Sequence, residues 1–141
     1  MKSTLVSSII ISLVSFSALA GPAVTVTFKN QGTQEAVMIV EDKNELLSFA
    51  DSMPKPKSKV VDGDTDKYIV QNTMVQSMNM AHVHYRIGTK HCVFRTVYMK
   101  NTSGIPQWTK SDKPSGGAFC NSVITSANPV SHEWSIELIM K

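Results

Sequence analysis

Apolar and polar residues alternate along most of the chain with a period of two, which is the pattern of half-buried β-strands. Val24, Val26 and Phe28 show it near the start, and residues 132–140 show it at the end. Residues 36–41 are apolar on both faces and predict an interior strand. About eight short strands of this kind, separated by turn residues, predict an all-β fold, an antiparallel β-sandwich, with a β-barrel as the second choice.

Residues 81–99 carry the best-specified hairpin signal in the sequence. Gly88-Thr89 is typical of a two-residue type II′ turn, in which glycine takes the first position. The cross-strand pairs that follow from this turn are Ile87 with Lys90, Tyr85 with Cys92, and Val83 with Phe94. This register puts four apolar side chains on one face, whereas a shift by one residue would mix polar and apolar side chains. Cys92 is therefore expected to point into the core.

The opposite face of this hairpin carries a histidine-rich set of side chains, which is a candidate binding face. Its members are His82, His84, Arg86, His91 and Arg95. His84 and His91 are diagonal neighbours in the predicted register, close enough for their side chains to meet. The face is interpreted either as an ordinary exposed surface of a sheet or as an anion- or partner-binding surface whose positive charge rises below pH about 6.5.

A third interpretation of the same segment is a metal site for copper or zinc. His82, His84 and His91 supply imidazoles, and Met78 and Met80 supply thioethers, which suit soft metal ions. Two features oppose it: the arginines of the face carry fixed positive charges, and the sequence has no closed ligand set of the zinc-finger kind. No other cofactor is predicted.

Two segments depart from the alternation. Residues 42–52 predict a helical turn or a structured loop, in which Leu46, Leu47 and Ala50 share a face. Residues 101–117 predict a long polar loop, because prolines, glycines and polar residues follow one another without a period.

Trp108 is the candidate anchor of the predicted loop, with Lys110 and Lys113 beside it. A tryptophan next to lysines in a loop is suited to a membrane interface or to a protein partner. In the alternative interpretation, Trp108 folds back and covers one end of the sandwich.

The N-terminus has the organisation of a secretory signal peptide that is cleaved after Ala20. Lys2 supplies the positive charge, residues 5–16 are an apolar stretch, and residues 18–20 have the small-x-small pattern of a cleavage site. The apolar stretch is short for a membrane span, which needs about 20 residues. Loss of 20 of the 141 residues leaves 121, a single domain at residues 21–141, and loss of Lys2 reduces the net charge from +3 to +2. We therefore expect a periplasmic or secreted protein with no transmembrane span in the mature chain.

Export to an oxidising compartment predicts that the two cysteines, Cys92 and Cys120, form a disulfide. Their separation of 28 positions corresponds to a stabilisation of roughly 3–4 kcal/mol in the loop-entropy model. The alternative, a thiolate metal ligand or a redox pair, lacks the C-x-x-C spacing that is typical of such sites.

Composition and motifs narrow the function classes. Charged residues make up 18% of the chain and hydrophobic residues 42%, which excludes a disordered tail and a coiled coil. The small net charge, without basic residues interleaved among aromatics, argues against nucleic acid. The sequence has no nucleophile elbow, H-E-x-x-H or phosphate-binding loop, so no enzyme is predicted. The expected function is an exported, non-enzymatic binding protein for a protein partner or an envelope component, with metal binding and membrane-lipid binding as alternatives.

Overall fold

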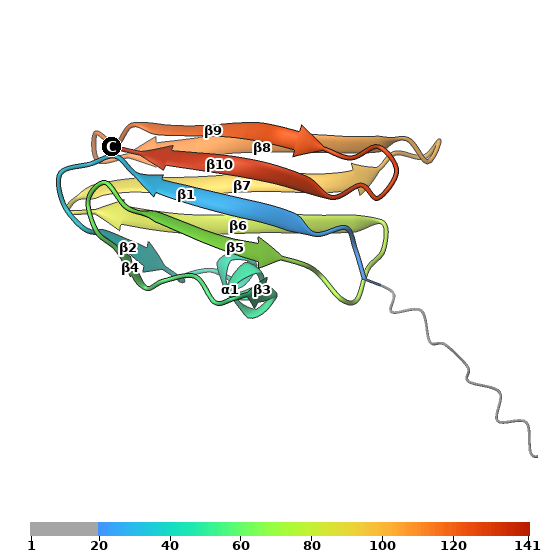
Figure 1. The fold of residues 1–141 in the computed structure, drawn as a ribbon, viewed down its shortest axis with the longest axis horizontal. Helices are drawn as coiled ribbons and strands as arrows, with labels where there is room; N and C mark the ends of the chain where they lie inside the picture. Colours follow the sequence, from blue (N-terminus) through green and yellow to red (C-terminus); the bar gives the residue numbers. More distant parts are fainter. Residues whose placement is uncertain (1–19) are drawn as a thin grey trace, which may run out of the picture.

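The computed structural model describes residues 20–141, and the predicted signal segment lies outside the described residues except for Ala20. Two five-stranded sheets stack face to face, as Figure 1 shows. The predicted β-sandwich is confirmed, and the strands within residues 20–141 do not close into a barrel.

The elements in chain order are β1 (Val24–Asn30), β2 (Ala36–Ile39), α1 (Lys43–Ala50), β3 (Ser52–Met53), β4 (Lys59–Val60), β5 (Thr65–Val70), β6 (Met78–Ile87), β7 (Lys90–Lys100), β8 (Pro106–Ser115), β9 (Cys120–Ala127) and β10 (Trp134–Met140). Sheet A has the strand order β3-β5-β1-β10-β9, and sheet B has the order β4-β2-β6-β7-β8. Neighbouring strands are antiparallel, except that the first and last strands, β1 and β10, run parallel to each other in the centre of sheet A.

The core lies between the sheets and follows the period-two pattern of the sequence. Every second side chain of β1 and β10 is buried, among them Phe28 and Trp134. Phe28 stacks on Tyr85 of the opposite sheet with ring centroids 3.6 Å apart. The Tyr85 hydroxyl meets that of Tyr68 at 3.0 Å, so these two buried polar groups satisfy each other. Burial of such large aromatic side chains supplies much of the hydrophobic stabilisation of a small domain.

Strands β6 and β7 form the predicted hairpin in the predicted register, with Tyr85 opposite Cys92. Cys92 is buried and is bonded to Cys120 of β9, with the two Cα atoms 5.7 Å apart. The predicted disulfide is therefore confirmed. Because β7 belongs to sheet B and β9 belongs to sheet A, the bond joins the two layers of the sandwich.

The prediction of a loop at residues 101–117 is wrong. Strand β8 occupies residues 106–115 and pairs with β7 along its length. It is an edge strand, and most of its side chains are exposed, so its sequence lacks the apolar alternation that marks a half-buried strand. Backbone hydrogen bonding to β7, rather than side-chain burial, keeps the segment extended.

Residues 43–50 form a helix, α1, where a helical turn or loop was predicted. Leu46, Leu47 and Ala50 all lie on the exposed side of the helix, with Leu46 and Leu47 56% and 57% exposed, whereas Glu45 and Ser48 are buried. The inner side of the helix is polar because it contacts polar groups of β6, namely the backbone N–H of His82 and the imidazole of His84.

Candidate functional site

Helix α1 packs against strand β6 and provides a hydrogen-bond partner for its backbone. Strand β2 pairs with residues 84–86 of β6, and α1 follows β2 in the chain and lies beside the preceding stretch of β6. There the N–H of His82 donates a hydrogen bond to Oγ of Ser48 at 2.8 Å. Because buried backbone groups need partners, the side of the helix that faces the strand has to be polar.

Helix α1 begins with a capping box that holds two carboxylates in fixed directions. Oδ1 of Asp42 accepts hydrogen bonds from the N–H groups of Asn44 and Glu45, at 2.7 and 2.8 Å. Oε2 of Glu45 accepts hydrogen bonds from the N–H groups of Glu41 and Asp42, at 2.6 and 3.2 Å. One oxygen of each carboxylate is therefore committed to the helix terminus, and the other oxygen stays available.

The available oxygens face the histidines of β6. Oε1 of Glu45 lies 3.3 Å from Nδ1 of His84, and Oδ2 of Asp42 lies 4.0 Å from Nε2 of His82. Asp42, Glu45 and His82 each offer one ligand atom, and these three atoms lie within 4.8 Å of one another. Asp42, Glu45, His82 and His84 together form the histidine centre. The side chains of Glu45 and His84 are 5% and 7% exposed, whereas that of Asp42 is 51% exposed, so the centre is buried at Glu45 and His84 and open to water at Asp42.

Two imidazole nitrogens of the centre have no hydrogen-bond partner within residues 20–141. They are Nδ1 of His82 and Nδ1 of His84, and both atoms are buried. The approach of Glu45 to His84 is thus a close polar contact that lacks the alignment of a hydrogen bond. A buried polar atom without a partner costs about 1–3 kcal/mol. A cation bound between the helix and the strand would satisfy such atoms.

His84 connects the centre to a third histidine. Its Nε2 lies 2.9 Å from Nδ1 of His91 on β7, which confirms that the two residues are neighbours. One of the two nitrogens donates the shared proton, and the tautomer decides which. Because His91 is only partly buried, the contacts from Glu45 through His84 to His91 lead from a buried carboxylate to the surface.

The charge state of the centre suits a cation. Burial lowers the pKa of His82 below its ordinary value of 6.5, and the positive charges of Arg95 and Lys113 act in the same direction, against the raising effect of Asp42 and Glu45. His82 is therefore neutral at pH 7 and has a lone pair to offer. The pKa of Asp42 is lowered, chiefly by the hydrogen bond from the N–H of Glu45, so this carboxyl group is ionised.

The other predicted residues of this segment lie around the centre. Arg95 is directly opposite His82 in the strand register, and its positive charge helps to lower the pKa of His82. Because Arg86 and Arg95 are exposed, water screens their charges and weakens their repulsion of a bound cation. Met78 and Met80 precede the histidines on β6 and line a groove beside α1.

Two residues of the centre, Asp42 and Glu45, were not singled out in the sequence. Their Asp-x-x-Glu spacing is a capping-box signature, so a helix N-terminus was detectable at this point. The sequence does not say that this helix terminus docks beside His82, because that contact joins segments that are distant in the chain.

Trp108 lies in β8 and is partly buried. Its indole N–H donates a hydrogen bond to the backbone oxygen of His132 at 3.2 Å, and the two rings lie 6.3 Å apart. Lys110 and Lys113 are exposed on the same strand. His132 occupies the turn before β10 with a φ of 64°, so the closing strand begins two residues later than predicted. A role of Trp108 as an anchor stays a prediction.

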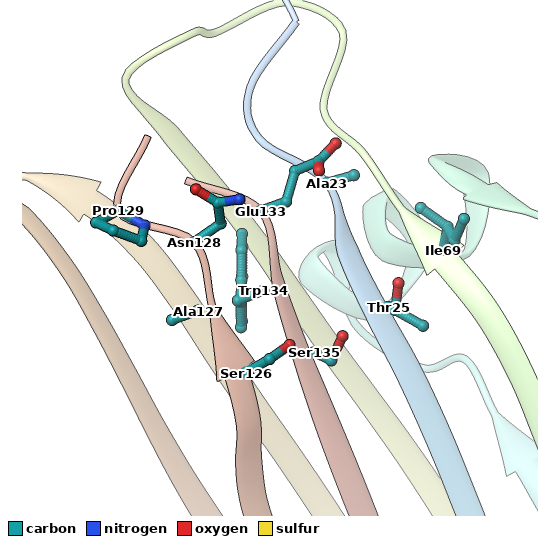
Figure 2. A pocket seen from close by; sticks show the side chains of 10 residues that line it. All are labelled: Ala23, Thr25, Ile69, Ser126, Ala127, Asn128, Pro129, Glu133, Trp134 and Ser135. Atoms are coloured by element: carbon teal, nitrogen blue, oxygen red, sulfur yellow. The ribbon is translucent and has the colours of Figure 1, made fainter. Parts of the chain in front are cut away.

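A separate hollow of about 660 Å³ lies at one end of sheet A, and Figure 2 shows the ten side chains that line it. They come from β1 and the residue before it, from β5, β9 and β10, and from the segment that joins β9 to β10, with Thr25 and Ile69 on one side and Asn128 on the other. Glu133 is the one titratable side chain among these ten. The hollow thus holds a single titratable group, whereas the histidine centre brings several titratable side chains together.

No protein-family model matches the chain, and a search of curated proteins finds no match either. In the stretch from residue 20 to residue 141, no helix is both long enough and apolar enough to cross a membrane. The proposal of function therefore rests on the geometry of the histidine centre.

Proposed function

We propose that this chain is an exported binding protein whose ligand is a divalent transition-metal ion, Zn²⁺ or Cu²⁺. The observation that carries the proposal is the convergence of Asp42, Glu45 and His82 within 4.8 Å, next to buried imidazole nitrogens without hydrogen-bond partners in residues 20–141. Carboxylate oxygen and imidazole nitrogen are donors that both ions accept.

The residues of the proposed site have separate roles. Asp42, Glu45 and His82 are the ligands, and their two carboxylates neutralise the charge of a divalent ion, which favours its binding at this partly buried site. His84 contacts Glu45 and is contacted in turn by His91, so these two histidines are positioning residues that orient a ligand. The capping box limits the movement of both carboxylates before an ion arrives.

Two features support an exported location, in the periplasm or outside the cell. Residues 1–20 have the sequence of a cleaved signal peptide, and the disulfide is of a kind that forms and persists in oxidising compartments. Because the disulfide occupies both cysteines, imidazole and carboxylate groups are the ligands that the chain offers to divalent ions.

Isothermal titration of the purified, chelator-treated protein with Zn²⁺ and with Cu²⁺ tests this proposal. We expect one ion per chain with a dissociation constant below micromolar, weakened at least about tenfold by His82→Asn. His132→Asn is a matched control, because His132 lies outside the centre and asparagine tolerates its positive φ. Binding weaker than micromolar by the wild type, or unchanged binding by His82→Asn, refutes the proposal.

A second candidate function is binding to a lipid surface, and it is suggested by exposed apolar side chains in the loops at one end of the sandwich. The loops β5–β6, β7–β8 and β9–β10 all reach this end (Figure 1). Each carries a prominent apolar side chain: Met74, Ile105 and Val130 are 85%, 57% and 87% exposed. Exposed apolar groups gathered at one end of a soluble domain are typical of interaction with a membrane or a partner.

Liposome flotation tests the second candidate. The wild type should float with vesicles, and replacement of Met74, Ile105 and Val130 together by serine should abolish flotation. Val61→Ser and Phe119→Ser are controls, because these apolar residues are 53% and 52% exposed in the β4–β5 and β8–β9 connections, at the opposite end of the sandwich. Failure of the wild type to float with either anionic or neutral vesicles refutes lipid binding.

A further inference from the structure

A groove of about 430 Å³ separates α1 from the loop that leads into β6, directly beside the proposed metal site. Met74, Met78 and Met80 line it, together with apolar residues such as Leu47. Asp51 is the one titratable side chain in its lining. The groove is therefore rich in thioether sulfur and poor in charge.

A fourth methionine adjoins the groove on the outer face of sheet B. Met99 of β7 is directly opposite Met78 in the strand register. Residues in that relation have Cβ atoms about 4.5–5.5 Å apart. Met80 follows Met78 on the same face of β6, about 7 Å further along the strand. Because methionine side chains are long and flexible, three sulfur atoms can converge above these two strands.

Met74 comes from the loop, which is tied to the same strand by hydrogen bonds. The N–H of Met74 donates to Oδ1 of Asn72 at 2.7 Å. The N–H of Asn72 donates in turn to Oδ1 of Asn79 on β6, at 3.1 Å. The loop thus places a fourth thioether at the solvent-exposed rim of the groove, so that four of the eight methionines of the chain lie in one region.

We propose that Met74, Met78, Met80 and Met99 form a second metal site, which binds Cu(I). Thioethers are soft, neutral donors and select Cu(I) over zinc. An apolar groove also disfavours a divalent ion more than a monovalent one, because removing the larger charge from water costs more. His82 follows Met80 on the same face of β6, so the soft site adjoins the site for a divalent ion. The inference deepens the proposed function by naming copper as the metal, and in this respect it rests on that function.

Anaerobic titration of the full chain with Cu(I), in competition with a chromogenic Cu(I) chelator, tests this site. The informative variant replaces all four methionines by leucine, which keeps the volume and the apolar character of the groove and removes the sulfur. We expect its Cu(I) affinity to fall at least about tenfold while its Zn²⁺ affinity stays unchanged. Met53→Leu is the control, because Met53 is an exposed methionine in β3, outside the cluster, and should bind Cu(I) like the wild type.

Methionine methyl NMR gives an independent measurement. Addition of Cu(I) should shift the ε-methyl signals of the four clustered methionines and leave those of Met38 and Met53 in place. If the wild type gives up all of its Cu(I) to the chelator, the proposed Cu(I) site is refuted. Wild-type Cu(I) affinity in the quadruple variant, whose fold is checked by thermal unfolding, also refutes it. Zn²⁺ titration of Glu45→Gln reports on the divalent site alone, so the two proposals fail separately.

Discussion

Replacing Glu45 by glutamine separates its structural role in α1 from its proposed role as a metal ligand. Oε2 accepts hydrogen bonds from the N–H groups of Glu41 and Asp42 at 2.6 and 3.2 Å, and the carbonyl oxygen of a glutamine can accept both. The amide nitrogen then takes the place of Oε1, 3.3 Å from Nδ1 of His84, and a small rotation of the side chain aligns it as a donor to this buried nitrogen.

The metal-free Glu45→Gln protein should therefore be nearly as stable as the wild type. Two hydrogen bonds change from charge-assisted to neutral, which costs about 1 kcal/mol each. The new bond to His84 offsets about 1 kcal/mol of this. The free energy of unfolding should thus fall by about 1 kcal/mol or less, whereas Glu45→Ala removes the cap without replacement and should cost about 2 kcal/mol.

The two proteins should differ strongly when a metal is present. An ion at 100 times its dissociation constant stabilises the folded state by about 2.7 kcal/mol. For a domain of this size that corresponds to a rise of about 10 °C in melting temperature. Thermal unfolding followed by circular dichroism, with EDTA or with Zn²⁺, should show this rise for the wild type and almost none for Glu45→Gln. An equal rise in both proteins refutes the ligand role, and a loss of several kcal/mol in EDTA refutes the proposed retention of the cap.

Acid should destabilise the metal-free protein: burial lowers the pKa of His82, so below pH 6.5 the unfolded chain takes up a proton more readily than the folded one. The free energy of unfolding from urea titrations should decline below this pH, and less so in His82→Asn. Replacing Cys92 and Cys120 together by serine should cost about 3–4 kcal/mol, and an unchanged urea midpoint would contradict the stabilising role of the disulfide. Ser48→Ala should cost about 1–3 kcal/mol, because it leaves the N–H of His82 without its acceptor. Leu46→Ser on the exposed side of α1 should change stability by less than about 0.5 kcal/mol, and equal losses in these two variants would contradict the orientation of the helix.

The strands of the core were predictable because their side chains alternate between a buried face and a face that is partly exposed to solvent. Val26 and Phe28 on β1 are buried, and their neighbours Thr25 and Thr27 are partly exposed, as the period of two requires. The same logic, together with the Gly88-Thr89 turn, predicts the register of the β6–β7 hairpin correctly.

Strand β8 escaped prediction, and helix α1 was predicted only as a helical turn or structured loop, because neither element buries a regular apolar pattern. Strand β8 is extended because its backbone pairs with that of β7. This pairing is available because β7 already lies in the sheet, and it does not depend on the side chains of β8. Helix α1 turns Glu45 and Ser48 inward and leaves Leu46 outside, which reverses the usual amphipathic order. The reversal follows from the polar groups of β6 that the helix covers.

The sequence by itself determined the inner faces of the sandwich, the register of the central hairpin and the pairing of Cys92 with Cys120. Each of these depends on local alternation, on turn chemistry or on the number of cysteines. Only the tertiary structure decided that Asp42 and Glu45 meet the histidines of β6. Hydrophobic periodicity reports which side chains leave water, whereas contacts among polar groups from distant segments depend on where the helix docks on the sheet.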